Sequence, residues 1–440
     1  MNRKSLILAA SALLMTFSIA GAQSIFDFPG FIQQEQTRPG NDEKVELDYD
    51  VDFHYYFDNM EFRQSEDQFQ YSQVLHMARI SPSIGFRFRQ DRNFTHRLML
   101  GVDVTKNLGE NPAEHIYYAE DESDAKLVNS KLFKDIFYYY NLQSNLGGGI
   151  LNLYAGIYPR TVMEGTYSRL FFSDDLKVTD PNLEGITLKY RTPLLFAEAG
   201  CDWLGYKGID RRERFMAYTA GEYSVVDWLK AGWAGAYTHV GGSYIQITRV
   251  DNVTVNPYFK VDFGKQLGIQ ELSARIGALA SVQLDRVIED EEAHLPFGAE
   301  GVITARHWGA GIENTIFYGD NMMVYKGSAY NNDFYSASYY TRLLYYGEPF
   351  YYTHRGYPAG YDRVELFYEP DFFEGMKFRV SAVGHFIFPA SEVIGSFLGW
   401  QAKASLVFDL DAVRHPQKRN SGQKNKRQEP VIPDGPTIRL

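Results

Sequence analysis

Residues 45 to 55 alternate strictly between two kinds of side chain. The odd positions, from Val45 to Tyr55, are apolar or aromatic, whereas the even positions, from Glu46 to His54, are acidic or histidine. Successive side chains of a β-strand point to opposite faces, so this segment has one apolar and one charged face. Such a strand is typical of a transmembrane β-barrel, in which lipid meets the outer face and water the inner face.

Similar runs recur along the chain and predict about sixteen strands, with roughly 14 to 18 left open. The connectors after even-numbered strands are short and rich in turn-forming residues, whereas several after odd-numbered strands are long. Bacterial outer-membrane barrels have short periplasmic turns and longer outside loops. We therefore predict an all-β fold, a transmembrane antiparallel β-barrel over 45–410. The predicted strands are 45–57, 75–89, 96–106, 131–143, 150–158, 183–191, 195–203, 213–223, 228–238, 252–263, 271–285, 297–307, 311–318, 362–369, 376–388 and 399–410.

The first 22 residues predict a secretory signal peptide. Arg3 and Lys4 precede an apolar stretch, and the small residues Ala20 to Ala22 form a cleavage site. We expect residues 23–44 to form a short periplasmic segment. An even number of strands then leaves both termini of the barrel in the periplasm of a Gram-negative bacterium.

Residues 411–440 lack alternation and are rich in basic and turn-forming residues. This composition predicts a disordered periplasmic tail. Two interpretations stay open for it: contact with an anionic periplasmic partner, or a tail that is simply solvated.

The composition limits the partners of the chain. Its net charge of −11 argues against nucleic-acid binding. Aromatic residues make up 15% of the chain, which suits the aromatic girdles of a barrel among outer-membrane lipid and lipopolysaccharide. The single cysteine, Cys201, lies on the apolar parity and is predicted to be a small lipid-facing residue. Association into a homotrimer is left open.

The polar parity of the predicted strands lines the lumen with charges of both signs. An acidic column on the first strand faces a partly basic column on the second, which would orient polar solutes or only stabilise the wall as a charge ladder. A calcium site at Asp48, Asp50 and Asp52 is disfavoured because alternate strand residues do not wrap one ion. We predict no metal and no cofactor. The predicted pore-lining residues are Glu46, Asp48, Asp50, Asp52, His54, Arg79, Arg87, Arg89, Lys189, Arg191, Arg275, Arg363, Glu365, Arg379 and Lys403.

The connector 319–361 is unusually rich in tyrosine, with 12 between Tyr318 and Tyr361 inclusive. Phenol rings stack on sugars and donate hydrogen bonds, so this loop is a candidate glycan-binding surface. A loop of this length also packs on itself or folds into the lumen. The candidate glycan contacts are Tyr339, Tyr340, Tyr345, Tyr346, Tyr351 and Tyr352.

Local enzyme signatures are missing from the chain. The motifs H-E-x-x-H, the P-loop and G-x-S-x-G do not occur, and the ten histidines are dispersed. His54, His76, His239 and His385 fall in or beside predicted strands, and no serine partner can be assigned to them. We therefore expect no enzyme. A barrel hydrolase is kept as an alternative, because catalytic groups are assembled in space rather than in sequence.

Four short segments resemble a known group of proteins. They are Tyr154–Arg160, Asn182–Gly185, Asp202–Gly205 and Tyr346–Tyr351. These stretches are similar to segments of porin-like outer-membrane barrels of Bacteroidetes-type bacteria. The resemblance implies a barrel and passive solute uptake, and it brings no catalytic residues with it.

These features predict an outer-membrane channel for passive diffusion of small polar solutes. The first alternative is a surface receptor or adhesin with a plugged barrel, whose tyrosine-rich loop captures glycans. The second alternative is the barrel hydrolase.

Overall fold

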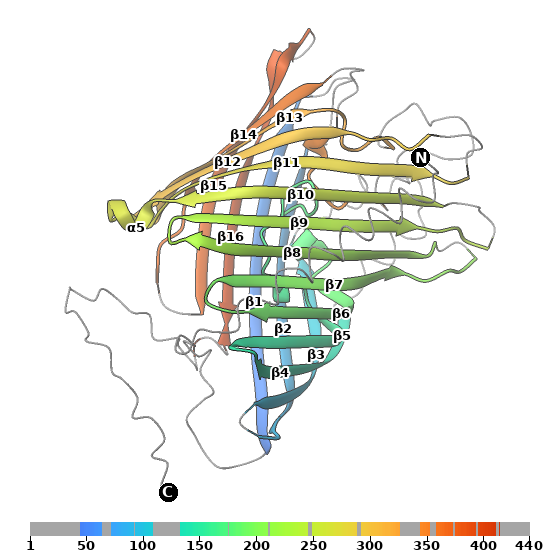
Figure 1. Cartoon of the computed structure of the whole chain (residues 1–440), viewed down its shortest axis with the longest axis vertical. Helices are drawn as coiled ribbons and strands as arrows, with labels where there is room; N and C mark the ends of the chain where they lie inside the picture. Colours follow the sequence, from blue (N-terminus) through green and yellow to red (C-terminus); the bar gives the residue numbers. More distant parts are fainter. Residues whose placement is uncertain are drawn as a thin grey trace, which may run out of the picture.

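A computed structural model shows a closed barrel of sixteen antiparallel strands (Figure 1). It describes residues 45–63, 72–91, 93–108, 133–174, 176–209, 212–244, 249–287, 292–325, 344–352, 358–372, 375–392, 395–410 and 413. The predicted segments 1–22 and 23–44, and the predicted tail apart from Val413, lie outside these residues. The strands are β1 (Val45–Phe62), β2 (Gln73–Arg89), β3 (Phe94–Asn107), β4 (Phe133–Leu146), β5 (Gly149–Pro159), β6 (Asn182–Arg191), β7 (Leu195–Gly205), β8 (Arg214–Val226), β9 (Leu229–Val240), β10 (Val250–Asp262), β11 (Glu271–Asp285), β12 (Phe297–His307), β13 (Ala310–Gly319), β14 (Ala359–Tyr368), β15 (Met376–Ser391) and β16 (Gly395–Asp409).

Each strand pairs with its neighbours in sequence, and β1 pairs with β16 to close the ring. Closure leaves no unpaired strand edge, which is the condition for a sheet to cross a bilayer. The predicted fold is therefore confirmed. The segments in which alternation is weakest also form strands, as β8, β12 and β13.

The two ends of the barrel differ in their connectors. Those after odd-numbered strands, such as 160–181 and 320–358, meet at what we call the long-loop end. Those after even-numbered strands, such as 147–148 and 308–309, meet at the short-turn end. Two connectors depart from this contrast: 392–394 is short, and 263–270, which contains α5 (Gly264–Leu267), is as long as 206–213. Among the described residues, no helix has the length and apolar character needed to cross a bilayer.

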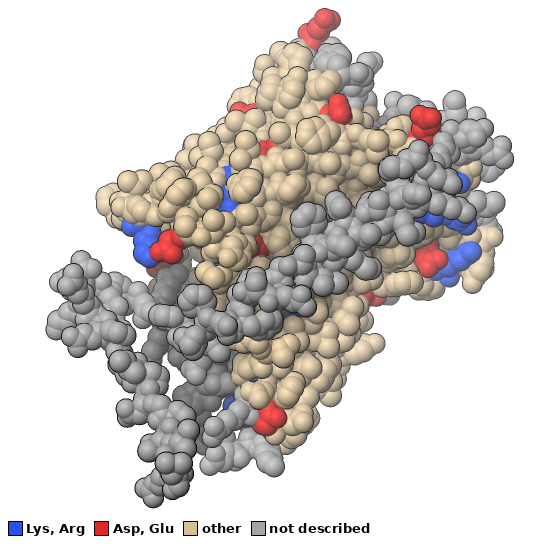
Figure 2. Space-filling view, viewed as in Figure 1, with Lys and Arg blue, Asp and Glu red and all other residues tan. Residues whose placement is uncertain are grey.

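The outer wall is apolar, as the alternation predicts. Leu47 is 60% exposed and Ile276 is 67% exposed, whereas the neighbouring Asp48 is buried on the inner side. The tan surface in Figure 2 shows few charged side chains over the described strands, and several of them lie near its margins. Cys201 is half-buried on the outer face, on the same parity as the exposed Trp203. An apolar wall around a closed ring is the architecture of an outer-membrane-type barrel.

Within the described part of the chain, two connectors turn into the lumen and pack there in the cluster given below, and we call them the plug segments. The first is 160–181, which contains η1 (Arg160–Val162) and α4 (Leu176–Thr179). The second is the described part of the β13–β14 connector, 320–325 and 344–352, which contains η3 (Pro349–Tyr351). Their apolar side chains pack with lumenal residues of the wall in one buried cluster. Its members include Leu170, Phe171, Met322, Phe350 and Leu398.

The plug segments touch each other through their backbones. The Ser173 amide donates to the Tyr346 carbonyl at 2.8 Å, and the Glu348 amide donates to the Arg169 carbonyl at 2.8 Å. Gly347 lies between these contacts, and a Cβ there would stand only 1.9 Å from the Leu170 carbonyl oxygen. Only glycine allows this approach, so the contact between the two segments requires glycine at position 347.

Candidate functional site

Charged side chains of the wall hold the plug segments in the lumen. Asp174 of the first segment accepts from Arg169 at 2.6 Å and contacts Lys403 of β16 at 3.1 Å. Arg169 also reaches Glu313 of β13 at 3.0 Å. Arg363 of β14 is 1% exposed, and its guanidinium bonds Glu365 at 2.8 Å. These groups compensate one another, which burial of charge requires.

Opposite charges shift the pKa values of the plug carboxylates downward. Burial acts to raise the pKa of Asp174, but Arg169, Lys403 and Arg363 together hold it well below its usual value. Glu164 behaves in the same way: burial acts to raise its pKa, and Lys189 and Arg191 lower it. Both carboxylates are therefore ionised and paired at neutral pH.

Most predicted pore-lining residues lie on the lumenal parity and are engaged in ion pairs or hydrogen bonds. Asp48 bonds both Arg87 at 2.8 Å and Arg97 at 2.7 Å. The carboxylate oxygens of Asp50 and Asp52 do not meet Asp48 but lie within 4.8 Å of each other and of one from Asp409. The further contacts are Arg79 to Asp103, Lys189 and Arg191 to Glu164, Arg275 to Glu300, Arg379 to Glu365, and Lys403 to Asp58. Glu46, His54 and Arg89 share the lumenal parity.

The described tyrosines of the 319–361 connector point into the barrel. The Tyr351 hydroxyl donates to Glu300 of β12 at 2.5 Å, and Tyr345 donates to Gln283 of β11 at 2.5 Å. Burial is the first cause that raises the pKa of Tyr346 to about 12, as it does for Tyr352. These side chains pack within the lumen, so glycan contact by them stays a prediction. Tyr339 and Tyr340 lie outside the described residues.

A histidine–carboxylate pair stands on the outer face, at the long-loop end. The Nδ1 atom of His239 lies 2.7 Å from Oδ1 of Asp251, and the Tyr237 hydroxyl donates to the same oxygen at 2.8 Å. The pair lies on the outer parity because the adjacent Val240 and Val250 face the lumen and are fully buried there. Placing a carboxylate and a histidine on a lipid-facing wall costs free energy, and polar residues kept at such positions usually mark a functional site. This pair is therefore a functional candidate.

The strand register explains how the pair forms. His239 of β9 lies directly opposite Asp251 of β10 on one side and Phe215 of β8 on the other. The Phe215 ring packs against the imidazole at 5.2 Å between centroids and stacks on Trp203 of β7 at 5.8 Å. Aromatic side chains of this kind lie where the bilayer core meets the headgroups. The pair is therefore held at the depth of an interface rather than in the middle of the membrane.

One nitrogen of the imidazole is open. Among the described residues, none donates to or accepts from Nε2 of His239, whose side chain is 18% exposed. Next to it is Gly241, where a Cβ would stand 3.3 Å from Nε2. With Asp251 ionised and accepting, the proton of the neutral ring sits on Nδ1, so Nε2 carries a lone pair. This arrangement is that of a general base oriented by a carboxylate.

One basic side chain contacts the pair, and another lies in a neighbouring connector. Arg286, just after β11, forms an ion pair with Oδ2 of Asp251, and its side chain is 40% exposed. Its amide donates to the carbonyl of Arg249 at 2.8 Å. Lys207 lies over the ring of Tyr244 at 5.5 Å, where the β7–β8 and β9–β10 connectors meet. Cations at this level suit an anionic headgroup.

The search for local motifs missed the pair for two reasons. His239 and Asp251 are 12 residues apart and come together only through the register of two strands. Both also lie one residue beyond the predicted strands 228–238 and 252–263, because β9 and β10 run further than the alternation shows. The sequence did contain one signal for this site. His239 and Asp251 are polar residues at the adjoining ends of two strands, at positions where the alternation otherwise places apolar residues.

Known structures with a similar fold are outer-membrane proteins. A loop-deletion mutant of OmpT from Vibrio cholerae is 9% identical, with a TM-score of 0.46, over 83% of this chain and 100% of that one. OmpF of Salmonella typhi, in complex with daunomycin, is 11% identical, with a TM-score of 0.43, over 83% and 98%. OprD of Pseudomonas aeruginosa is 9% identical, with a TM-score of 0.40, over 82% and 93%.

Comparison with curated proteins gives no significant match. A family model, in contrast, matches residues 37–357, a range that contains the strands from β1 to β13 and the His239–Asp251 pair. Its description names a deacylase, so the prediction that the chain is not an enzyme is wrong. That prediction rested on local motifs, which a site assembled from neighbouring strands does not contain. The chain belongs to the lipid A 3'-O-deacylase-type family.

Proposed function

We propose that the protein hydrolyses an ester-linked acyl chain of a lipid A-type glycolipid, with His239 as the general base. The observation that carries the proposal is the outward histidine–carboxylate pair with an open Nε2. The family description supplies the substrate class. In this proposal the long-loop end faces the outside of the cell, which puts the pair at the headgroup level of the outer leaflet.

The chemistry follows from the roles of the two side chains. Nε2 of His239 takes a proton from a water molecule, whose oxygen attacks the ester carbonyl. The tetrahedral intermediate collapses, and the imidazolium gives its proton to the departing sugar oxygen. The products are a free fatty acid and a sugar hydroxyl. Asp251 accepts a hydrogen bond from Nδ1–H throughout, which fixes the tautomer and stabilises the imidazolium.

Arg286 supplies the recognition of the headgroup in this proposal. Its guanidinium forms an ion pair with Asp251, and its side chain is 40% exposed. Planar guanidinium groups bind phosphate oxygens with two parallel hydrogen bonds. A phosphate held there would place the neighbouring ester beside His239.

The test is a pair of histidine variants on the same face of the barrel. His239→Gln is expected to lower kcat for fatty-acid release from lipid A in detergent micelles by about 10²- to 10⁴-fold. His76→Gln is the matched control, because His76 is also outward at the long-loop end but its Nε2 is bonded to the Tyr55 hydroxyl at 2.9 Å. Mass spectrometry identifies the lost acyl chain. Equal activity of the two variants would rule out the assignment.

Passive diffusion through the lumen is a second candidate. The wall carries ionised groups of both signs, as in the Asp48, Arg87 and Arg97 cluster, which suits an aqueous lumen. The plug segments occupy part of that lumen, and one pocket left between them and β8–β10 has room for roughly one water molecule. Single-channel recordings in planar bilayers test this candidate, and a sealed barrel at all voltages would count against it.

A further inference from the structure

The lumenal side of the wall directly behind the His239–Asp251 pair is packed by a plug segment. Val240 follows His239 and Val250 precedes Asp251, and these two valines are cross-strand partners with no exposed surface. Tyr325 and Leu344 of the β13–β14 plug segment complete one buried cluster with them. The same strand ends therefore carry the pair outside and the cluster inside.

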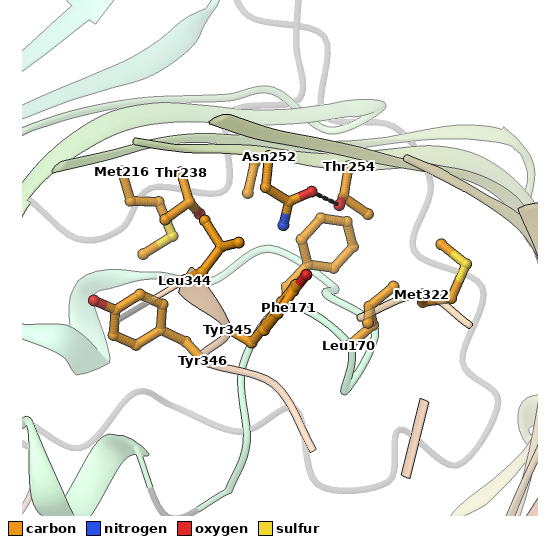
Figure 3. A pocket seen from close by; sticks show the side chains of 11 residues that line it. Leu170, Phe171, Met216, Thr238, Asn252, Thr254, Met322, Leu344, Tyr345 and Tyr346 are labelled. Atoms are coloured by element: carbon orange, nitrogen blue, oxygen red, sulfur yellow. Dashed lines mark hydrogen bonds between the residues drawn. The ribbon is translucent and has the colours of Figure 1, made fainter. Parts of the chain in front are cut away.

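The close-up in Figure 3 shows lumenal residues next to this cluster, with Leu344 of the cluster among them. Thr238 and Asn252, lumenal residues of β9 and β10, hang from the strands, and Leu344 and Tyr345 approach them from the plug. Leu344 is 1% exposed, so its side chain is in full contact with its neighbours. Interiors packed this closely transmit the loss of even a few methyl groups to the backbone around them.

Hydrogen bonds connect the same plug segment to the end of β11, directly before Arg286. The Asp285 amide donates to the Tyr325 hydroxyl at 2.7 Å, inside the barrel, one residue before Arg286. The Tyr325 amide in turn donates to the Tyr345 hydroxyl at 3.0 Å, and Tyr345 donates to Gln283 at 2.5 Å. The end of β11 is thus fixed from the lumen, while Arg286 on its outer side pairs with Asp251.

We propose that the β13–β14 plug segment is a positioning element for the outer site, and that Tyr325 and Leu344 are its positioning residues. They set the orientation of His239 toward Asp251 through the strand ends of β9, β10 and β11, without touching substrate. This inference rests on the proposed function. It predicts that loosening the plug slows the chemical step and leaves substrate binding to the exposed wall almost unchanged.

The first experiment compares two leucines that are both almost fully buried. Leu344→Ala is expected to lower kcat at least 10-fold with KM within twofold of wild type. Leu398→Ala is the matched control, since Leu398 of β16 is 3% exposed in the lumenal cluster and is not among the residues that pack on Val240 and Val250. The control is expected to keep kcat within twofold. Leu344→Met, which refills the space, is expected to restore most of the activity.

The second experiment covers the case in which Leu344→Ala fails to fold in micelles. Tyr325→Phe removes only the hydroxyl that accepts from Asp285, and it is expected to lower kcat three- to tenfold and to shift the pH profile of kcat. Tyr361→Phe removes a lumenal hydroxyl that contacts His385 instead, and it is expected to leave both unchanged.

The outcomes separate this inference from the proposed function. Activity of Leu344→Ala equal to that of Leu398→Ala, or of Tyr325→Phe equal to wild type, would overturn the positioning role while an inactive His239→Gln still upheld the hydrolase. Full activity of His239→Gln would overturn the proposed function and this inference with it.

Discussion

His385 in the lumen and His239 on the outer wall are two histidines of the same barrel in opposite states. His385 has no exposed surface, and both of its ring nitrogens are engaged, by the Tyr361 hydroxyl at 2.7 Å and by Gln401 at 2.8 Å. The Phe350 ring also stacks on it at 4.4 Å. His239 has one nitrogen engaged by Asp251 and one nitrogen with no hydrogen-bond partner among the described residues. A histidine is therefore a candidate general base because one of its ring nitrogens is available to accept a proton, and not because of its residue type alone.

The largest expected effect is a contrast between substitutions at these two histidines: one lowers activity and the other lowers stability. His239→Gln should reduce deacylation by about 10²- to 10⁴-fold and leave thermal unfolding nearly unchanged. His385→Gln should keep activity within about threefold but lower the free energy of unfolding by about 1–3 kcal/mol, because buried partners lose a hydrogen bond. Fatty-acid release and unfolding in micelles measure both. An equal loss of activity in both variants would contradict the distinction between a catalytic His239 and a structural His385.

The next effect concerns the buried charges of the lumen. Arg363→Met removes the 1% exposed guanidinium that faces Glu365 and Glu313, and leaves those carboxylates without it. We expect a loss of about 3–5 kcal/mol in the free energy of unfolding. The same change at the exposed Lys265, which lies 3.8 Å from Asp227, should cost almost nothing. Urea titration of the two variants, followed by tryptophan fluorescence, decides between them.

A smaller effect is expected at the outer site. Arg286→Lys keeps the positive charge but loses the planar fork, so KM for a phosphorylated lipid A should rise about tenfold, or about 1.4 kcal/mol, at nearly constant kcat. A dephosphorylated lipid A should not distinguish the variant from wild type. A fall in kcat alone would assign Arg286 to the chemical step instead of headgroup recognition.

The smallest effect is a pH dependence inside the plug. The pKa of Asp174 is held well below its usual value, so its ion pairs add stability above the unfolded pKa of about 3.9 and lose it as the pH falls through the lowered value. Its side chain is 39% exposed, so we expect at most about 1 kcal/mol. The stability gap between wild type and Asp174→Asn should be constant from pH 7 to 5 and shrink only below about pH 4. A gap that closes by pH 5 would contradict the lowered pKa.

The strands and their lumenal charges could be predicted because both follow from a period of two. Asp48 faces Arg87 as the alternation of β1 and β2 requires. The outer site could not be predicted, because His239 and Asp251 interrupt the apolar parity just where the alternation fades. Folding of the 319–361 connector into the lumen was one of two outcomes that its length predicted, but its course could not be predicted, since connectors carry no period. Its anchors, such as Tyr351 on Glu300, depend on contacts between distant parts of the chain.

The position of Asp174 has a consequence for how the barrel assembles in the membrane. Asp174 contacts Lys403 of β16, and Lys403 also contacts Asp58 of β1, so one plug carboxylate stands at the seam where the first and last strands meet. The plug segment that carries it lies between β5 and β6, and is synthesised long before β16. The segment is therefore already present when β16 is made, and pairing of β16 with β1 brings Lys403 within reach of both Asp58 and Asp174.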